Sequence, residues 1–182
     1  MLVCYAVALA LLGALGLFCW LVVRPVLEAR AVIGDVYGKH CARQAGLDSF
    51  DAWVPENEVK AALERLGGPE KAIPALRIYV RLPDRLAPYT ILAVQMLGRC
   101  GKEAVPTLIG FIRNQDHMGN DAVDAAVVEL GDFGSEARAA VPVLTELRKS
   151  AQVGLCESID EAIEKIRAEK PPPPPGDAPK SD

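Results

Sequence analysis

Two histidines are the first residues of this chain that could carry acid–base or metal chemistry. His40 stands beside Cys41, the pair that a cysteine nucleophile and its base would need. Adjacent residues on one helix point about 100° apart, so the sequence predicts a surface pair and no catalytic dyad. His117 falls between Asp116 and Asp121 without the further His or Cys ligands of a zinc site. We therefore expect a solvated loop there.

Carboxylates and one serine are the next candidates for acid–base or nucleophilic work. Asp121, Asp124, Glu129 and Asp132 are spread along one segment without the paired burial that raises a carboxylate pKa, which predicts a solvated acidic face. Ser135 belongs to no Gly-x-Ser-x-Gly elbow and is expected to cap a helix. No glycine-rich phosphate loop follows a predicted strand. The sequence thus predicts a protein that is not an enzyme, with no catalytic residue, cofactor or metal.

The cysteines and the net charge exclude further classes of function. Cys4 and Cys19 fall in the apolar start of the chain, and Cys41, Cys100 and Cys156 remain, an odd number without a Cys-x-x-Cys pair. This pattern disfavours a disulfide framework and favours a reducing compartment. The formal charge of -4 disfavours nucleic acid as a partner, because phosphate binding needs clustered Lys and Arg. No feature points to a small-molecule substrate.

The first part of the chain has the length and composition of a membrane anchor. Residues 2–23 form an uncharged run of 22, enough for a helix to cross about 30 Å of hydrocarbon, and Trp20 is placed to anchor at the interface. A cleaved signal peptide is the alternative, but no Lys or Arg precedes the run, and the small-residue site at residues 29–31 follows it at some distance. We therefore expect a single-pass anchor over residues 1–30.

Basic residues after the apolar run predict how such an anchor would be oriented. They are Arg24, Arg30, Lys39 and Arg43, against the terminal amine on the other side. The positive-inside rule then places the domain in the cytoplasm. An exported or periplasmic domain, or one secreted after cleavage, stays open as the alternative.

Beyond an irregular or helical connector at residues 31–55, a helical repeat domain is expected over residues 56–170. Apolar residues recur at i, i+3, i+4 and i+7, which indicates helices with one buried face. The four sets are Val59, Ala62, Leu63 and Leu66; Thr90, Ala93, Val94 and Leu97; Val123, Ala126, Val127 and Leu130; and Ile159, Ala162, Ile163 and Ile166. A glycine follows each of the first three sets and not the fourth, which predicts that the last helix caps the stack.

Paired glycines and a proline separate these helices from a second set. Gly67, Gly98 and Gly131 are expected to end the first helices in the left-handed conformation, and Gly68, Gly101 and Gly134 to let the chain reverse. Pro74 and Pro106 are expected in the first turn of the second helices, where a missing N–H costs little. Pro142 comes later relative to its glycine, so we predict a kink or break just before it. A non-helical path from Ser135 to Val141 is the alternative.

Seven residues after each repeat proline stands a basic residue, and stacking of the repeats would align the three. These are Arg81, Arg113 and Lys149, and Arg77 and Arg85 extend the series. Together Arg77, Arg81, Arg113 and Lys149 could bind a partner. The favoured alternative is that they offset the dipoles of helix C-termini, at about 0.3 to 1 kcal/mol each.

Residues 97–108, Leu-Gly-Arg-Cys-Gly-Lys-Glu-Ala-Val-Pro-Thr-Leu, resemble the consensus of bacterial HEAT repeats, in the short variety also seen in phycobilisome-lyase-like repeats. The resemblance covers residues 59–167. It implies an all-α fold: a short right-handed α-solenoid of antiparallel helix pairs, preceded in this chain by one N-terminal transmembrane helix. The usual Asp-x-x-Val-Arg start is degraded, because Asp124 stands where Arg would be expected. Such solenoids bind other macromolecules, although a fold alone supplies no function.

These observations favour a membrane-tethered, non-catalytic scaffold or adaptor for a protein partner of unknown identity. One alternative is an accessory subunit of a lyase or protein-modifying enzyme, which would need a partner chain or a reactive cysteine. Another is a weak nucleic-acid-binding repeat module. Residues 171–182, which begin with five prolines, are expected to form a spacer and a disordered tail.

Overall fold

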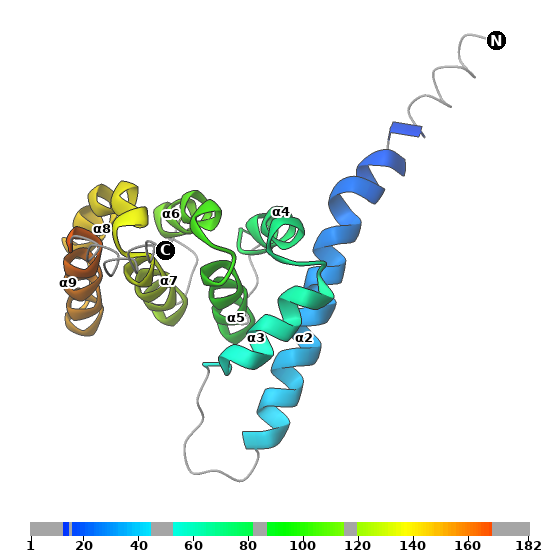
Figure 1. The fold of residues 1–182 in the computed structure, drawn as a ribbon, viewed down its shortest axis with the longest axis horizontal. Helices are drawn as coiled ribbons and strands as arrows, with labels where there is room; N and C mark the ends of the chain where they lie inside the picture. Colours follow the sequence, from blue (N-terminus) through cyan, green and yellow to red (C-terminus); the bar gives the residue numbers. More distant parts are fainter. Residues whose placement is uncertain (1–12, 15, 45–52, 82–86, 115–119, 169–182) are drawn as a thin grey trace, which may run out of the picture.

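A computed structural model of the chain is all-helical over the residues it describes, namely 13–14, 16–44, 53–81, 87–114 and 120–168 (Figure 1). The all-α prediction is confirmed. The elements in chain order are the π-helical turn η1 (Cys19–Val23), α2 (Arg24–Gln44), α3 (Glu56–Arg65), α4 (Pro69–Tyr79), α5 (Ala87–Gly98), the 3-10 turn η2 (Lys102–Ala104), α6 (Val105–Arg113), α7 (Asn120–Asp132), the 3-10 segment η4 (Gly134–Ala140), α8 (Val141–Arg148) and α9 (Val153–Arg167).

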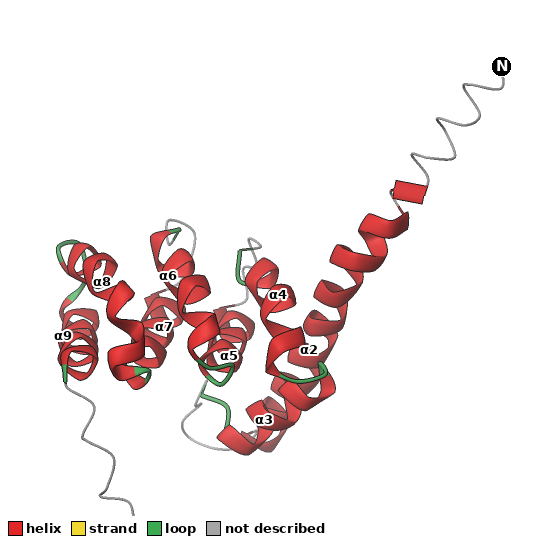
Figure 2. Cartoon of the chain, turned by 45° about the horizontal axis from the view of Figure 1, so that its top comes forward, coloured by secondary structure: helices red, strands yellow, loops and turns green. Residues whose placement is uncertain are grey.

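The short helices alternate between two rows, as in an α-solenoid. Helices α3, α5, α7 and α9 form one row, and α4, α6 and α8 form the other (Figures 1 and 2). Within the first row α5 packs on α3, α7 on α5 and α9 on α7. Stacking of this kind lets short amphipathic helices bury faces that one pair could not cover alone.

The predicted apolar sets lie in the core between these rows. All four residues of the sets on α5, α7 and α9 are buried, as are Val59, Ala62 and Leu63 on α3. Leu66 is the exception, because it lies at the end of α3 and is only partly buried. The spacing of apolar residues therefore predicted the inward faces of the first-row helices correctly.

The predicted transmembrane helix is wrong. Among the described residues, no helix is long and apolar enough to cross a membrane. Helix α2 begins at the charged residue Arg24 and buries Ala29, Ile33 and Val36 in the core that it shares with α3, α4 and α5. Residues 1–12 and 15 of the predicted span lie outside the described part. The connector expected at residues 31–55 is helical as far as Gln44, and residues 45–52 are not described.

The conformations of the glycines at the joints match our prediction only in part. Gly67 is left-handed as expected, with φ of 85°, but Gly98 and Gly131 lie inside α5 and α7. The chain reverses at Gly68, Gly101 and Gly134 as predicted, with φ of 93°, 83° and 53°. Because Gly98 and Gly131 have ordinary helical conformations, their reason for being glycine has to lie in packing.

The prolines fit the expectation at two joints of three. Pro106 lies in the first turn of α6, and α8 starts at Val141 after η4, whose Ala137 leaves helical geometry, so the predicted break before Pro142 is confirmed. The position predicted for Pro74 is wrong, because α4 starts at Pro69 and holds Pro74 in its interior. Pro69 lies in the first turn of α4, where proline is tolerated best, because a backbone N–H at this position would have no partner within the helix.

Candidate functional site

The residues considered for nucleophilic or metal chemistry are not arranged for it. His40 is buried in α2, where its Nε2 lies 2.9 Å from Gln44 Nε2, so the expected surface pair with Cys41 is wrong. Ser135 lies inside η4, whose N-cap is Phe133, and makes no capping bond. His117 is outside the described residues. Within the described part, no group of three or more His, Cys, Asp or Glu side chains could hold a metal.

Cys100 has the environment of a structural thiol. Its side chain is 7% exposed, and its Sγ donates a hydrogen bond to the Met96 carbonyl oxygen at 3.1 Å. Burial raises the pKa of the thiol to about 12. Because the thiolate is the nucleophile, a thiol that stays protonated at neutral pH is a poor reactive centre.

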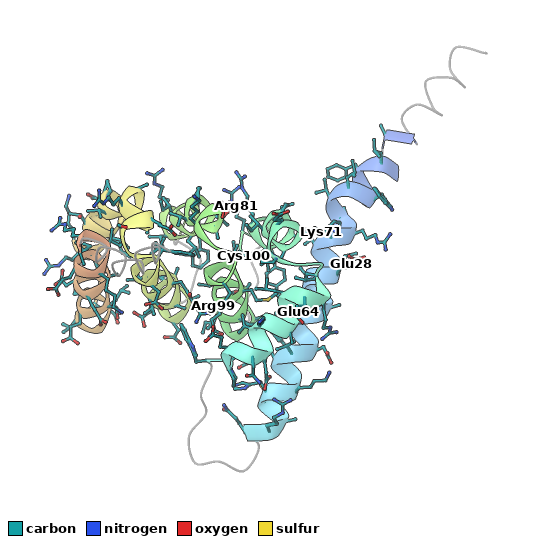
Figure 3. All side chains as sticks on the ribbon, in the orientation of Figure 1. Glu28, Glu64, Lys71, Arg81, Arg99 and Cys100 are labelled. Carbon is teal, nitrogen blue, oxygen red and sulfur yellow. The ribbon has the colours of Figure 1, made fainter. Side chains whose placement is uncertain are left out.

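The four basic residues predicted as a binding stripe are all exposed and belong to the row of α4, α6 and α8. Arg77 lies in α4, Arg81 just beyond its end, Arg113 in the last turn of α6, and Lys149 at the C-cap of α8. Arg81 extends over the neighbouring helix: its guanidinium would lie 3.4 Å from a Cβ on Gly110 of α6 (Figure 3). The sequence spacing thus placed these residues on one row correctly.

Arg113 occupies the position of Arg81 in the next repeat. It lines a cavity of about 210 Å³ between α6 and α8, together with Val143, Glu146 and Leu147 among others. Glu146 follows Pro142 by four residues, as Gly110 follows Pro106. Arg81 thus lies against this position of α6, which is a glycine, and Arg113 lines the same cavity as the corresponding residue of α8, which is a glutamate.

The basic residues of the stripe differ in whether their charges are paired. Lys149 pairs with Glu146 at 2.6 Å, so its charge is met within α8. Within the described part of the chain, Arg77, Arg81 and Arg113 form no ion pair, as holds also for several exposed cations elsewhere, such as Lys60 and Lys102. We call Arg77, Arg81 and Arg113 the open cations; they share one row, on α4, just beyond its end, and on α6.

Glu129 is the functional-site candidate that the sequence prediction missed. It is 1% exposed in the middle of the core, so the prediction of a solvated acidic face is wrong at this residue. Its neighbours on α7 fit the prediction better: Asp121 and Asp132 are exposed, and Asp124 is half-buried. A buried carboxyl needs a specific set of partners, since ionised groups are costly to remove from water.

Those partners are few. Glu129 Oε2 lies 3.3 Å from an Nη of Arg99, and Glu129 Oε1 has no hydrogen-bond partner among the described residues. Arg99 also lies 3.6 Å from Glu56. Burial raises the pKa of Glu129 to about 7, with Asp132 and Glu56 acting in the same direction and Arg99 opposing them.

Comparison of the repeats gives only a partial signal for this residue. Aligned on the apolar sets, Glu129 corresponds to Arg65 before Leu66, to Met96 before Leu97 and to Lys165 before Ile166. Arg65 and Lys165 are exposed, and Met96 is buried. The burial of Glu129 therefore depends on the helices around it and does not follow from its position in the repeat.

A larger cavity of about 750 Å³ lies at the joint before α4, between its first turns and Cys100 and Glu103. Its charged lining residues, Glu70, Lys71 and Glu103, are of mixed sign. The cysteine in this lining is the protonated thiol described above. The cavity therefore has room for a ligand, but none of its described lining residues is an evident nucleophile.

Comparisons of the chain with protein-family models, with curated proteins and with solved structures gave no match. The similarity to HEAT repeats consequently stays a prediction, which rests on the motif at residues 97–108 and its copies.

Proposed function

We propose that this chain is a non-catalytic helical-repeat scaffold that binds an acidic segment of a protein partner along α4 and α6. The observation that carries the proposal is the set of open cations, which are exposed on neighbouring helices of one row and form no ion pair with any other described residue. Unpaired, exposed guanidinium groups are suited to carboxylates, because each can donate two parallel hydrogen bonds.

The contact between Arg81 and Gly110 supports a binding role beyond compensation of a helix dipole. A cation that only offsets the C-terminus of α4 would be expected to stay near the carbonyls of its own helix. Arg81 instead extends over α6, where the absence of a side chain at Gly110 leaves room for its guanidinium. This arrangement brings its charge toward that of Arg113.

The pairing of Lys149 with Glu146 suggests where binding ends. With its charge already met in α8, Lys149 offers less to an acidic partner than Arg81 or Arg113. We therefore expect a short acidic segment that crosses α4 and α6, and no long anionic polymer that would need the whole row.

Binding of fluorescently labelled acidic peptides to the full chain tests this function. Reversal of Arg81 and Arg113 to Glu should weaken binding by at least about tenfold, since each change replaces an attraction with a repulsion. The matched control reverses Lys60 and Lys102, which are also exposed but lie on α3 and η2. The melting temperature should stay nearly constant in both double variants.

Two results would reject the proposal. Equal weakening by the Lys60 and Lys102 control would show attraction by total charge, and binding unaffected by either pair would place the site elsewhere. Duplex DNA of comparable charge serves as the second probe. If it binds more tightly than the peptides, with a strong dependence on salt, the chain is a nucleic-acid-binding module.

A further inference from the structure

The packing of α5 against α7 is built around a carboxyl group. A Cβ placed on Gly98 would stand 1.8 Å from Glu129 Oε2 and 2.2 Å from its Cδ. The carboxyl therefore fills the volume that any side chain at residue 98 would need. We call the contact formed by Gly98, Arg99 and Glu129 the α5–α7 seam.

The next contact in the stack shows that this chain can join such helices without a buried carboxyl group. Between α7 and α9 the equivalent glycine is Gly131, and a Cβ there would lie 3.0 Å from Ala162 Cα and 3.1 Å from its Cβ. Ala162 lies against Gly131 as Glu129 lies against Gly98. A small apolar residue therefore suffices to close this kind of joint, and the glutamate adds a property that closure alone does not require.

That property is a dependence on ionisation. The carboxyl has one contact at 3.3 Å, to a guanidinium that is 34% exposed, and its second oxygen has no partner within the described part of the chain. A buried carboxylate normally needs several hydrogen bonds to compensate for lost hydration. Loss of the proton therefore strains the seam, and the pKa of about 7 puts this event near neutrality.

The charged groups around Glu129 do not remove that strain. Arg99 of α5 favours ionisation, while Glu56 of α3 and Asp132 of α7 oppose it. Lys165 of α9 lies 3.5 Å from Asp132 and offsets the charge of that residue.

Helices α6 and η4 also pack on α7, and α8 continues from η4. Their charged side chains are Arg113, Glu136, Arg138, Glu146 and Arg148. None of these is among the groups that shift the pKa of Glu129.

We propose that the α5–α7 seam is a pH-responsive joint, in which protonated Glu129 keeps α7 docked on α5 and ionised Glu129 loosens it. On ionisation the proton leaves to solvent, and the carboxylate turns toward Arg99 and water, which separates the two helices locally. The α7–α9 contact, where Gly131 packs on Ala162 and on the aliphatic part of Lys165, buries no carboxyl group and stays closed.

Amide hydrogen exchange on the full chain measures this opening between pH 5 and pH 8, after correction for the intrinsic rate. In the wild type, the opening constant for buried α7 amides should rise on the order of 50-fold across this range, because the open form ionises at the ordinary pKa. Amides of α3 should change much less. Glu129→Gln keeps the shape of the side chain without the titration, and its α7 amides should change by less than about threefold.

Asp121→Asn is the matched control, since it removes an exposed carboxylate from the same helix that is not among the groups that shift the pKa of Glu129, and it should preserve the wild-type rise. If Glu129→Gln folds poorly, Glu129→Met repeats the test with the residue found at position 96. A rise that persists without Glu129, or the absence of any rise in the wild type, overturns the proposal. An equal rise in α3 and α7 also overturns it, because the protein would then unfold as a whole.

Discussion

Replacement of Gly98 by alanine is the most direct test of how the α5–α7 seam is packed. The new methyl group would stand 1.8 Å from Glu129 Oε2, whereas non-bonded atoms keep about 3.5 Å apart. The carboxyl would have to move by about 1.7 Å in a core where it is 1% exposed. Overpacking of this kind costs about 1–3 kcal/mol, and the better helix propensity of alanine offsets about 1 kcal/mol. We expect a net loss of about 0–2 kcal/mol.

The same substitution should have the opposite sign once the carboxyl is removed. In a Glu129→Ala background no side-chain atom occupies the space, so Gly98→Ala should stabilise the protein by up to about 1 kcal/mol. The two changes would then be coupled by about 1–3 kcal/mol, the cost of overpacking, which is above the error of additivity for distant sites.

Urea unfolding followed by circular dichroism measures these free energies in the wild type, both single variants and the double variant. Gly131→Ala is the matched control. Its Cβ would meet the backbone at Ala162 Cα, so Glu129→Ala should not rescue it. Equal destabilisation by Gly98→Ala in both backgrounds would show that the carboxyl does not occupy the space beside residue 98, and would refute this packing of the seam.

Other buried groups make three more expectations measurable. Because the folded pKa of Glu129 is raised from 4.5 to about 7, its contribution to stability is complete below about pH 4.5 and is lost as the pH rises through 7. Unfolding free energies should therefore fall by about 3 kcal/mol across this range, and Glu129→Met should abolish the fall. Gln95 bonds the backbone N–H and C=O of Val54, so Gln95→Ala should cost about 2 kcal/mol and speed proteolysis near Val54. In the native protein, mass spectrometry after alkylation should find Cys156 modified well before Cys100, whose burial and raised pKa keep it protonated.

Periodicity predicted the helices well because it reports the property that decides packing. The apolar sets on α5, α7 and α9 are buried as expected, since a face that is apolar at helical spacing has no better environment than a neighbouring helix. The basic residues were placed on one row for the same reason, because they keep a fixed distance from the prolines of the second helices.

The errors arose where a residue type has two possible explanations. Glycine can permit a left-handed turn or a close approach, and at Gly98 and Gly131 the close approach is what the structure shows. Two prolines, Pro69 and Pro74, could each occupy the first turn of α4, and the structure places Pro69 there. Glu129 was expected to be solvated, because its burial depends on the partner helix and cannot be derived from its own.

Helix α2 is packed on the repeats along part of its length and projects beyond them at its N-terminal end (Figure 1). Ala29 and Ile33 are fully buried, while toward the N-terminus the helical path leaves the stack through Leu27 and continues into η1 at Trp20, both of which are exposed (Figure 1). Helix α2 itself is uninterrupted, so it has no hinge between its fixed and projecting parts. The angle at which the projecting part leaves the repeats is therefore set by the packing of α2 on α3, α4 and α5, which begins at Ala29. Enlarging Ala29 would change that angle before it changed the repeats themselves.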